Sequence, residues 1–266
     1  PGDTVLYTSD STCFASSNRL APSFTEMDYV PESFVSILSG ATVDTISGAV
    51  DGSVEFNLGT TNVEYISVNN NDTLRCDFEV TVLDTIAPEL ICQDDASILV
   101  PFIQDRYSYT GYAPGISDNC GIDSSYYVLT RGDGSLDTAS TDSVSIELSR
   151  GVNEILTIAQ DESGNRDSCI QRISVVGFEC PENAVFNNQP GQCSGITENL
   201  DLDFDPDSLI SDIFYSVTGD TSYIVNEPGL EDSASGDTLP VGNYEITYTV
   251  VSTGGDSSSC TSFIRV

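Results

Sequence analysis

One pattern of residues recurs three times in the chain: Cys76-Asp-Phe-Glu-Val-Thr-Val82, Cys169-Ile-Gln-Arg-Ile-Ser-Val175 and Cys260-Thr-Ser-Phe-Ile-Arg-Val266. The three cysteines are 93 and 91 residues apart. A glycine and then a Glu-bearing apolar run precede each cysteine, and the Gly-to-Cys distances are 17, 18 and 18 residues. Matched spacings of this kind indicate that one unit of about ninety residues is repeated three times.

Apolar and polar residues alternate with a period of two inside these units, as in Ser53–Leu58, Ser143–Leu148 and Tyr244–Val250. Such alternation is typical of strands with one buried and one solvated face. Clusters of Gly, Asn, Asp and Ser separate the runs at the spacing expected of a sandwich. The sequence therefore predicts an all-β protein made of three tandem antiparallel β-sandwich domains, at 1–84, 85–176 and 177–266.

The composition excludes several classes of activity. The 266 residues include 42 acidic side chains, eight Arg, no Lys and no His, which gives a formal net charge of −34. A Ser-His-Asp hydrolase needs an imidazole, and Schiff-base enzymes and P-loops need a Lys. Nucleic acid is not an expected partner, because phosphate binding depends on clustered basic residues. Membrane insertion is not expected either, because no apolar run approaches ~18 residues.

The cysteines point to a compartment. Eight Cys suit an oxidising, extracellular setting. The sequence contains no CxxC pair, so it does not indicate a zinc or redox motif. The acidic residues are spread along the whole chain, which indicates a solvated surface in saline or calcium-containing water. We therefore expect a secreted or cell-surface protein.

The second unit carries a distinctive set of motifs: Asp84-Thr-Ile-Ala-Pro88, Cys92, Ser117-Asp-Asn-Cys-Gly121, Asp161-Glu-Ser-Gly-Asn165 and Cys169. In these residues it resembles a hyalin repeat (HYR domain). The resemblance implies immunoglobulin-like sandwiches in large secreted or surface-anchored adhesive proteins, without enzymatic activity.

The other two units resemble this family less closely. The third does so through Cys180-Pro181, Leu239-Pro-Val-Gly242, Tyr248 and Cys260, but it lacks the Asp-Asn-Cys-Gly element and the Asp…Ser-Gly-Asn turn. The first is the most degenerate and is placed mainly by its spacing and its final strand.

The resemblance also implies how the cysteines pair, because the opening and final-strand cysteines of two-Cys members would be neighbours. The pairs would be Cys92–Cys169, Cys180–Cys260 and, as the only pairing inside the first unit, Cys13–Cys76.

Two cysteines, Cys120 and Cys193, are left over by this scheme. Alternative pairings are Cys92–Cys120 and Cys193–Cys260, since the sequence alone does not fix connectivity. An unpaired cysteine would be a free thiol or would form a bond between chains. Most of the cysteines are expected to stabilise small cores.

Calcium is the cofactor that the acidic residues suggest, because this ion takes six to eight oxygen ligands, largely from carboxylates. In Asp201-Leu-Asp-Phe-Asp-Pro-Asp207, four carboxylates (Asp201, Asp203, Asp205 and Asp207) occupy alternate positions and would share one side of an extended strand.

A second cluster would form from Asp84, Asp118 and Asp161 if the ends of the repeats converge. The alternative for both sets is that they are ordinary solvated acidic loops.

Three further motifs are weak. Arg131-Gly-Asp133 is the tripeptide that integrins read, but Asp-Gly is also an ordinary hairpin signal. Asn71-Asp-Thr73 is a glycosylation sequon. Exposed tyrosines of the second unit could stack on sugars, although such rings more often pack between sheets. The tyrosines concerned are Tyr107, Tyr109, Tyr112, Tyr126 and Tyr127.

These observations favour a structural and adhesive role. Short connectors, such as 84–88 and 176–180, would join the sandwiches into a semi-rigid stalk or a fibre subunit, with neighbouring repeats or copies of the same chain as partners. The alternative is a module that binds a glycan or a surface protein through loops at the sandwich ends, above all 201–212. A two-carboxylate glycosidase is the remaining enzymatic hypothesis, but no acidic pair stands out.

Overall fold

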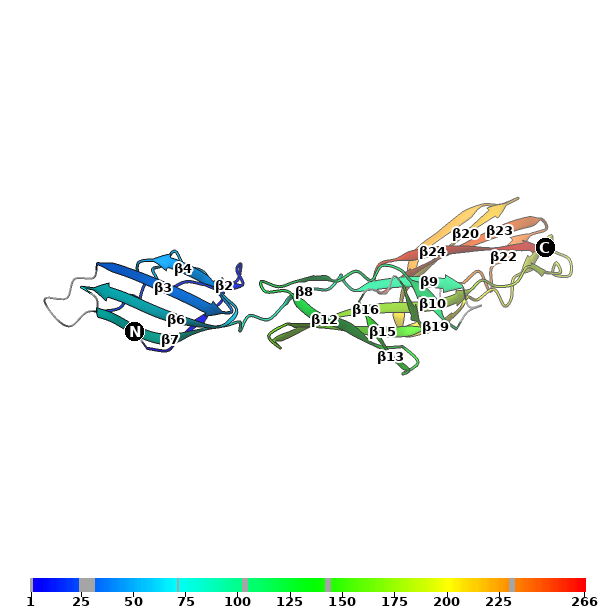
Figure 1. The fold of residues 1–266 in the computed structure, drawn as a ribbon. Helices are drawn as coiled ribbons and strands as arrows, with labels where there is room; N and C mark the ends of the chain where they lie inside the picture. Colours follow the sequence, from blue (N-terminus) through cyan, green and yellow to red (C-terminus); the bar gives the residue numbers. More distant parts are fainter. Residues whose placement is uncertain (1, 24–31, 71, 102–104, 142–144, 230–232) are drawn as a thin grey trace. The chain divides into compact units, whose positions relative to one another are not determined.

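The computed structural model describes residues 2–23, 32–70, 72–101, 105–141, 145–229 and 233–266. The described chain is all-β, apart from one three-residue 3₁₀ helix, η1 (Asp207–Leu209). Its strands form three β-sandwich units, so the predicted fold class is confirmed (Figure 1). Ser143 and Val144, part of a predicted strand, lie outside the described residues.

The chain divides into two compact units. The first comprises residues 1–91, 115–125 and 158–168, and the second comprises 92–114, 126–157 and 169–266. The first compact unit therefore combines the first sandwich with three segments of the second repeat, 85–91, 115–125 and 158–168.

The first sandwich has a five-stranded sheet. Its order is β1 (Thr4–Tyr7), β7 (Asp72–Leu83), β6 (Gly59–Asn69), β3 (Ser33–Gly40) and β4 (Asp44–Ser47). All pairs are antiparallel except β1 with β7, which run parallel. A short pair, β2 (Phe14–Ala15) with β5 (Phe56–Asn57), supplies the facing layer. The buried side chains alternate along β6, so Val63 and Tyr65 enter a core that also contains Phe56 and Leu38.

The first unit also contains a small pair from the second repeat, β8 (Glu89–Ile91) antiparallel to β11 (Gly115–Ser117). β11 ends immediately before the Asp-Asn-Cys-Gly motif.

The second sandwich is built on a six-stranded sheet. Its strands are β13 (Leu136–Ser140), β12 (Ile122–Thr130), β15 (Gly151–Asp161), β16 (Arg166–Glu179) and β19 (Asp203–Asp205), with β9 (Ala96–Pro101) parallel to β16. The facing pair is β10 (Tyr107–Tyr109) with β14 (Ile146–Leu148). Strand β16 continues to Glu179, past the predicted boundary at 176, and there pairs with β19.

The third sandwich has the sheet order β17 (Ala184–Val185), β24 (Ser257–Arg265), β23 (Asn243–Ser252), β20 (Ile210–Gly219) and β21 (Tyr223–Gly229). The facing pair is β18 (Ser194–Ile196) with β22 (Thr238–Pro240). Tyr248 is fully buried in its core, and its hydroxyl donates a hydrogen bond to the carbonyl of Leu200. Burial raises the pKa of this hydroxyl, so the ring remains neutral inside the core.

Three disulfides connect the cysteines: Cys92–Cys169, Cys180–Cys260 and Cys13–Cys120. The first two are the pairs that the family resemblance implies. Cys76 and Cys193 are free and exposed.

The expected Cys13–Cys76 pair is wrong, and the register of the first sheet explains why. β1 lies parallel to β7 with Tyr7 opposite Leu83, so the segment that carries Cys13 emerges at the end of β7. Cys76 lies seven residues earlier in the same strand, about 23 Å away at the rise of a β-strand. Cys13 instead meets Cys120, which follows β11.

Candidate metal centre

Three aspartates from three strand ends converge in the first compact unit. Asp84 directly follows β7, Asp118 directly follows β11, and Asp161 is the last residue of β15. Each offers one carboxylate oxygen, and these oxygens all lie within 4.8 Å of one another. The structure thus brings together the second acidic cluster that the sequence suggested.

Asp84 is held by one of its two carboxylate oxygens. Its Oδ1 accepts hydrogen bonds from the Thr8 hydroxyl at 2.8 Å and from the backbone N–H of Ile86 at 3.1 Å, and the Asn119 side-chain amide donates to it at 3.5 Å. Its Oδ2 is buried and has no hydrogen-bond partner among the described residues. The residue is only 7% exposed, so this oxygen is closed off from bulk solvent.

Backbone amides fix the other two carboxylates. Oδ1 of Asp118 accepts from the N–H groups of Cys120 and Gly121 at 2.7 and 2.9 Å. Oδ1 of Asp161 accepts from the N–H groups of Ser163 and Asn165 at 2.9 and 2.8 Å. These bonds explain the local sequence, because Asp is the residue whose side chain bonds to the backbone of its own turn.

Three buried oxygens near this cluster remain without a partner in the described part of the chain. They are Oδ2 of Asp84, Oδ2 of Asp118 and Oδ1 of Asn119. A buried polar atom without a partner costs about 1–3 kcal/mol, and more if it is charged. Native proteins rarely leave three such atoms together unless an unseen water or ion binds there.

The electrostatics of the cluster are unfavourable for the chain alone. None of the ion pairs between described residues includes any of the three aspartates, and the protein has no Lys. Two carboxylates 4.8 Å apart repel by about 3.5 kcal/mol at an effective dielectric constant of ~20. A divalent cation would replace this repulsion by attraction.

The donor set fits a hard cation. All the candidate ligands are oxygens, which suits calcium or magnesium, whereas zinc favours His nitrogen or Cys sulfur. The nearest cysteine, Cys120, is already in a disulfide. Asn119, which the sequence analysis did not single out, adds a neutral amide oxygen to the three carboxylates.

The other predicted metal cluster, Asp201, Asp203, Asp205 and Asp207, does not form. Only Asp203–Asp205 belongs to a strand (β19); the chain then leaves the sheet at Pro206 and enters η1 at Asp207. All four side chains are exposed, and Asp205 lies 3.5 Å from the guanidinium of Arg150. Among the described residues, the only group of three or more potential ligands is the Asp84, Asp118 and Asp161 cluster.

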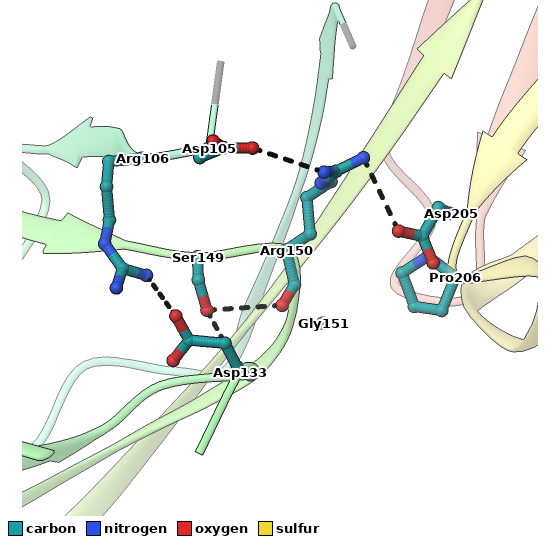
Figure 2. Close-up of a pocket in the computed structure, with 9 residues that line it drawn as sticks. Asp105, Arg106, Asp133, Ser149, Arg150, Gly151, Asp205 and Pro206 are labelled. Carbon is teal, nitrogen blue, oxygen red and sulfur yellow. Dashed lines mark hydrogen bonds and ion pairs between the residues drawn. The ribbon is translucent and has the colours of Figure 1, made fainter. Parts of the chain in front are cut away.

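A surface pocket in the second compact unit contains part of the Arg-Gly-Asp tripeptide (Figure 2). Asp133 forms an ion pair with Arg106 at 2.6 Å, and hydrogen bonds from Ser135 and Arg106 hold its pKa well below the usual Asp range. Arg131 is bound in turn to Asp137 at 2.7 Å. Both charged ends of the tripeptide are therefore already engaged within the chain.

The other weak motifs are also placed by the structure. Tyr107, Tyr112 and Tyr127 are buried in the core of the second sandwich and Tyr109 packs against it, so these four do not form a stacking surface. Tyr126 is exposed. Asn71 of the sequon lies outside the described residues.

No protein-family model matches the sequence, and no curated protein matches it. Several solved structures of tandem repeats are similar in fold. Drosophila N-cadherin EC1-3 is 15% identical, with a TM-score of 0.37, and the match covers 100% of this chain and 98% of that one. The titin domains of a three-immunoglobulin structure are 13% identical, with a TM-score of 0.37, and the match covers 87% of this chain and 87% of that one.

A Ca²⁺-stabilized adhesin with which an Antarctic bacterium binds ice is also similar, at 11% identity and a TM-score of 0.30. That match covers 88% of this chain and 64% of the adhesin structure. These similarities, to cadherin and adhesin repeats among others, concern the fold. No helix in the described chain is long and apolar enough to cross a membrane.

Proposed function

We propose that this chain is a non-enzymatic structural segment of an extracellular adhesive protein, in which tandem HYR-like sandwiches, divided near residues 84 and 176, act as a calcium-stabilised tether. The observation that carries the proposal is the overlap of two disulfides. Cys92 lies inside the loop closed by Cys13–Cys120, and Cys120 lies inside the loop closed by Cys92–Cys169. Consecutive repeats are therefore linked covalently in addition to the main chain.

This connectivity limits how far the chain can extend. The shortest covalent route from residue 1 to residue 266 passes through all three bridges and contains about 57 residue-to-residue steps instead of about 265. At about 3.5 Å per residue, the fully unfolded oxidised chain reaches about 220 Å, against about 930 Å after reduction. A short reach under load suits a tether.

The redox state supports an extracellular location. Disulfides persist in oxidising compartments and are rare in the cytosol. Six of the eight cysteines are bridged here. The acidic surface is suited to saline water, where dissolved cations screen its self-repulsion.

Calcium is the cation that we assign to the Asp84, Asp118 and Asp161 cluster. Its flexible coordination by six to eight oxygens accepts three carboxylates, one amide oxygen and water, whereas magnesium demands near-octahedral geometry and retains its water. The ion would hold the Asp118 and Asp161 turns against the end of β7. Calcium thus adds to the unit the kind of cross-link that the disulfides supply.

Single-molecule force spectroscopy tests the tether function. The full chain is pulled between attachment points at its two ends, before and after reduction with a dithiol. We expect the contour length of the completely unfolded chain to be about four times smaller in the oxidised chain. Oxidised chains that extend as far as reduced ones would exclude the proposal, as would hydrolysis of any polysaccharide in a glycosidase screen.

A further inference from the structure

The Cys13–Cys120 disulfide is adjacent in sequence and in space to half of the candidate calcium ligands. Cys120 directly follows Asp118 and Asn119, and its backbone N–H donates to Oδ1 of Asp118 at 2.7 Å. Cys13 directly follows Thr12, whose carbonyl accepts a hydrogen bond from the Asn119 amide at 3.4 Å. The bridge therefore joins the two segments whose contacts position these two ligands.

Asn119 is oriented by the groups on both sides of this bridge. Its Nδ2 lies 3.4 Å from the carbonyl oxygen of Thr12, 3.4 Å from the Cys120 sulfur and 3.5 Å from Oδ1 of Asp84. These contacts use the nitrogen end of the amide. The oxygen end, Oδ1, is left buried and without a partner, as is Oδ2 of Asp118.

From this arrangement we infer that the Cys13–Cys120 disulfide is a positioning element of the calcium site, so that the bridge and the bound ion stabilise each other. The inference rests on the calcium site of the proposed function and adds its regulation by thiol–disulfide chemistry. An intact bridge holds Asp118 and Asn119 beside Asp84, and a reduced bridge frees the 118–121 turn. By thermodynamic linkage, an ion that binds the bridged form more tightly must protect the bridge to the same degree.

The redox step needs an external reductant, and a small dithiol supplies it. One thiolate of the dithiol attacks a sulfur of the Cys13–Cys120 bond and forms a mixed disulfide; the second thiolate then displaces the protein sulfur. The products are two protein thiols and the cyclic disulfide of the reagent, with two electrons and two protons transferred. Calcium takes no part in the electron transfer and acts only by holding the bridged conformation.

The first experiment measures calcium binding to the full chain by isothermal titration calorimetry after the metal has been stripped with EGTA. We compare the wild type with the double variant Cys13→Ser/Cys120→Ser. The matched control is Cys180→Ser/Cys260→Ser, which removes a bridge of the other compact unit. We expect the first variant to bind calcium at least about tenfold more weakly, as for the loss of groups that orient metal ligands, and the control to bind as the wild type does.

The second experiment needs no variant, so it remains informative even if removal of the bridge unfolds the first compact unit. The wild-type chain is brought to equilibrium with a mixture of reduced and oxidised dithiothreitol in calcium, in magnesium or in EGTA. Each reduced cysteine is then alkylated and identified by mass spectrometry. Calcium should raise the equilibrium ratio of bridged to reduced Cys13–Cys120 by about tenfold or more, in line with the coupling expected above. The reduction of Cys180–Cys260 should not change.

The outcomes separate the inference from the function on which it depends. If the wild type binds calcium but the bridge variant binds equally well, or if calcium leaves the ratio of bridged to reduced Cys13–Cys120 unchanged, the coupling is refuted and the calcium site stands. If the wild type binds no calcium at millimolar concentration, the calcium part of the proposed function fails, and the coupling fails with it.

Discussion

Removing a buried charge usually destabilises a protein, but the substitution Asp84→Asn should stabilise this one. It removes one of three negative charges that repel one another in the cluster. An asparagine retains an oxygen for the Thr8 hydroxyl and the Ile86 amide, which now bond to Oδ1 of Asp84 at 2.8 and 3.1 Å. It also puts an NH₂ group where the unpartnered Oδ2 now lies. That group can donate to the neighbouring carboxylates, so the variant removes repulsion and gains hydrogen bonds.

The size of the effect follows from the geometry of the cluster. Three carboxylates within 4.8 Å make three repulsive pairs of about 3.5 kcal/mol each at an effective dielectric constant of ~20. Asp84 contributes to two of these pairs, and their sum is an upper bound because salt and water screen it. Without calcium, we therefore expect Asp84→Asn to stabilise the first compact unit by roughly 1–3 kcal/mol.

Calcium should invert this order. At a free calcium concentration of a thousand times its dissociation constant, the wild type gains about 4.1 kcal/mol in free energy of unfolding, which exceeds the roughly 1–3 kcal/mol above. The variant has lost one anionic ligand and gains much less. The wild type is then the more stable protein in calcium, and Asp84→Asn is the more stable protein in EGTA.

Urea unfolding followed by circular dichroism, in EGTA and in calcium, measures both differences. Asp203→Asn is the matched control, because Asp203 is an exposed aspartate that belongs to no close acidic cluster among the described residues. It should leave both curves where the wild type has them. The reasoning is refuted if Asp84→Asn is less stable than the wild type in EGTA, or if calcium stabilises both proteins equally.

Three further outcomes follow from side chains outside the cluster. Ellman's reagent should titrate two thiols per native chain, Cys76 and Cys193, and a count of zero or four would contradict the disulfide assignment. Asn153→Ala should cost about 3 kcal/mol in urea unfolding, because Asn153 is fully buried and its amide donates to three backbone carbonyls. Asp133 should titrate well below 3.8 by NMR, and Arg106→Ala should raise its midpoint. Because its folded pKa is depressed, the stability that Asp133 contributes is present above its unfolded pKa and is lost as the pH falls through the folded value.

The two-residue period of the apolar side chains and the spacing of the repeats were sufficient to predict the fold class. The alternation in Tyr244–Val250 appears in β23, where Tyr244, Ile246 and Tyr248 are buried and the residues between them are more exposed. A two-residue period leaves little freedom once one face must be buried. The repeat spacing likewise placed the final cysteines Cys169 and Cys260 on the corresponding strands β16 and β24.

The pairing of Cys13 could not be predicted in the same way, since it depends on contacts between repeats. The sequence analysis sought partners inside each unit, but Cys13 finds Cys120 at a sequence separation of 107 residues. The parallel register of β1 on β7 determines which end of the sheet Cys13 approaches. A parallel pair between distant strands leaves no local signal in a single sequence.

The location of the metal cluster follows from where the repeats differ. β15–β16 and β23–β24 end in the same kind of turn, since the N–H of Asp161 donates to the carbonyl of Asn165 and the N–H of Ser252 donates to that of Asp256. Ser252 in the third sandwich therefore occupies the position of Asp161 in the second. The Ser252 hydroxyl is buried and accepts a hydrogen bond from that of Ser97, a neutral contact that needs no ion. One backbone geometry thus carries a satisfied hydroxyl in one repeat and a charge without a counter-charge in another. A charge buried without a counter-charge is costly to the fold, so its presence at only one of two equivalent turns argues for a ligand at that turn.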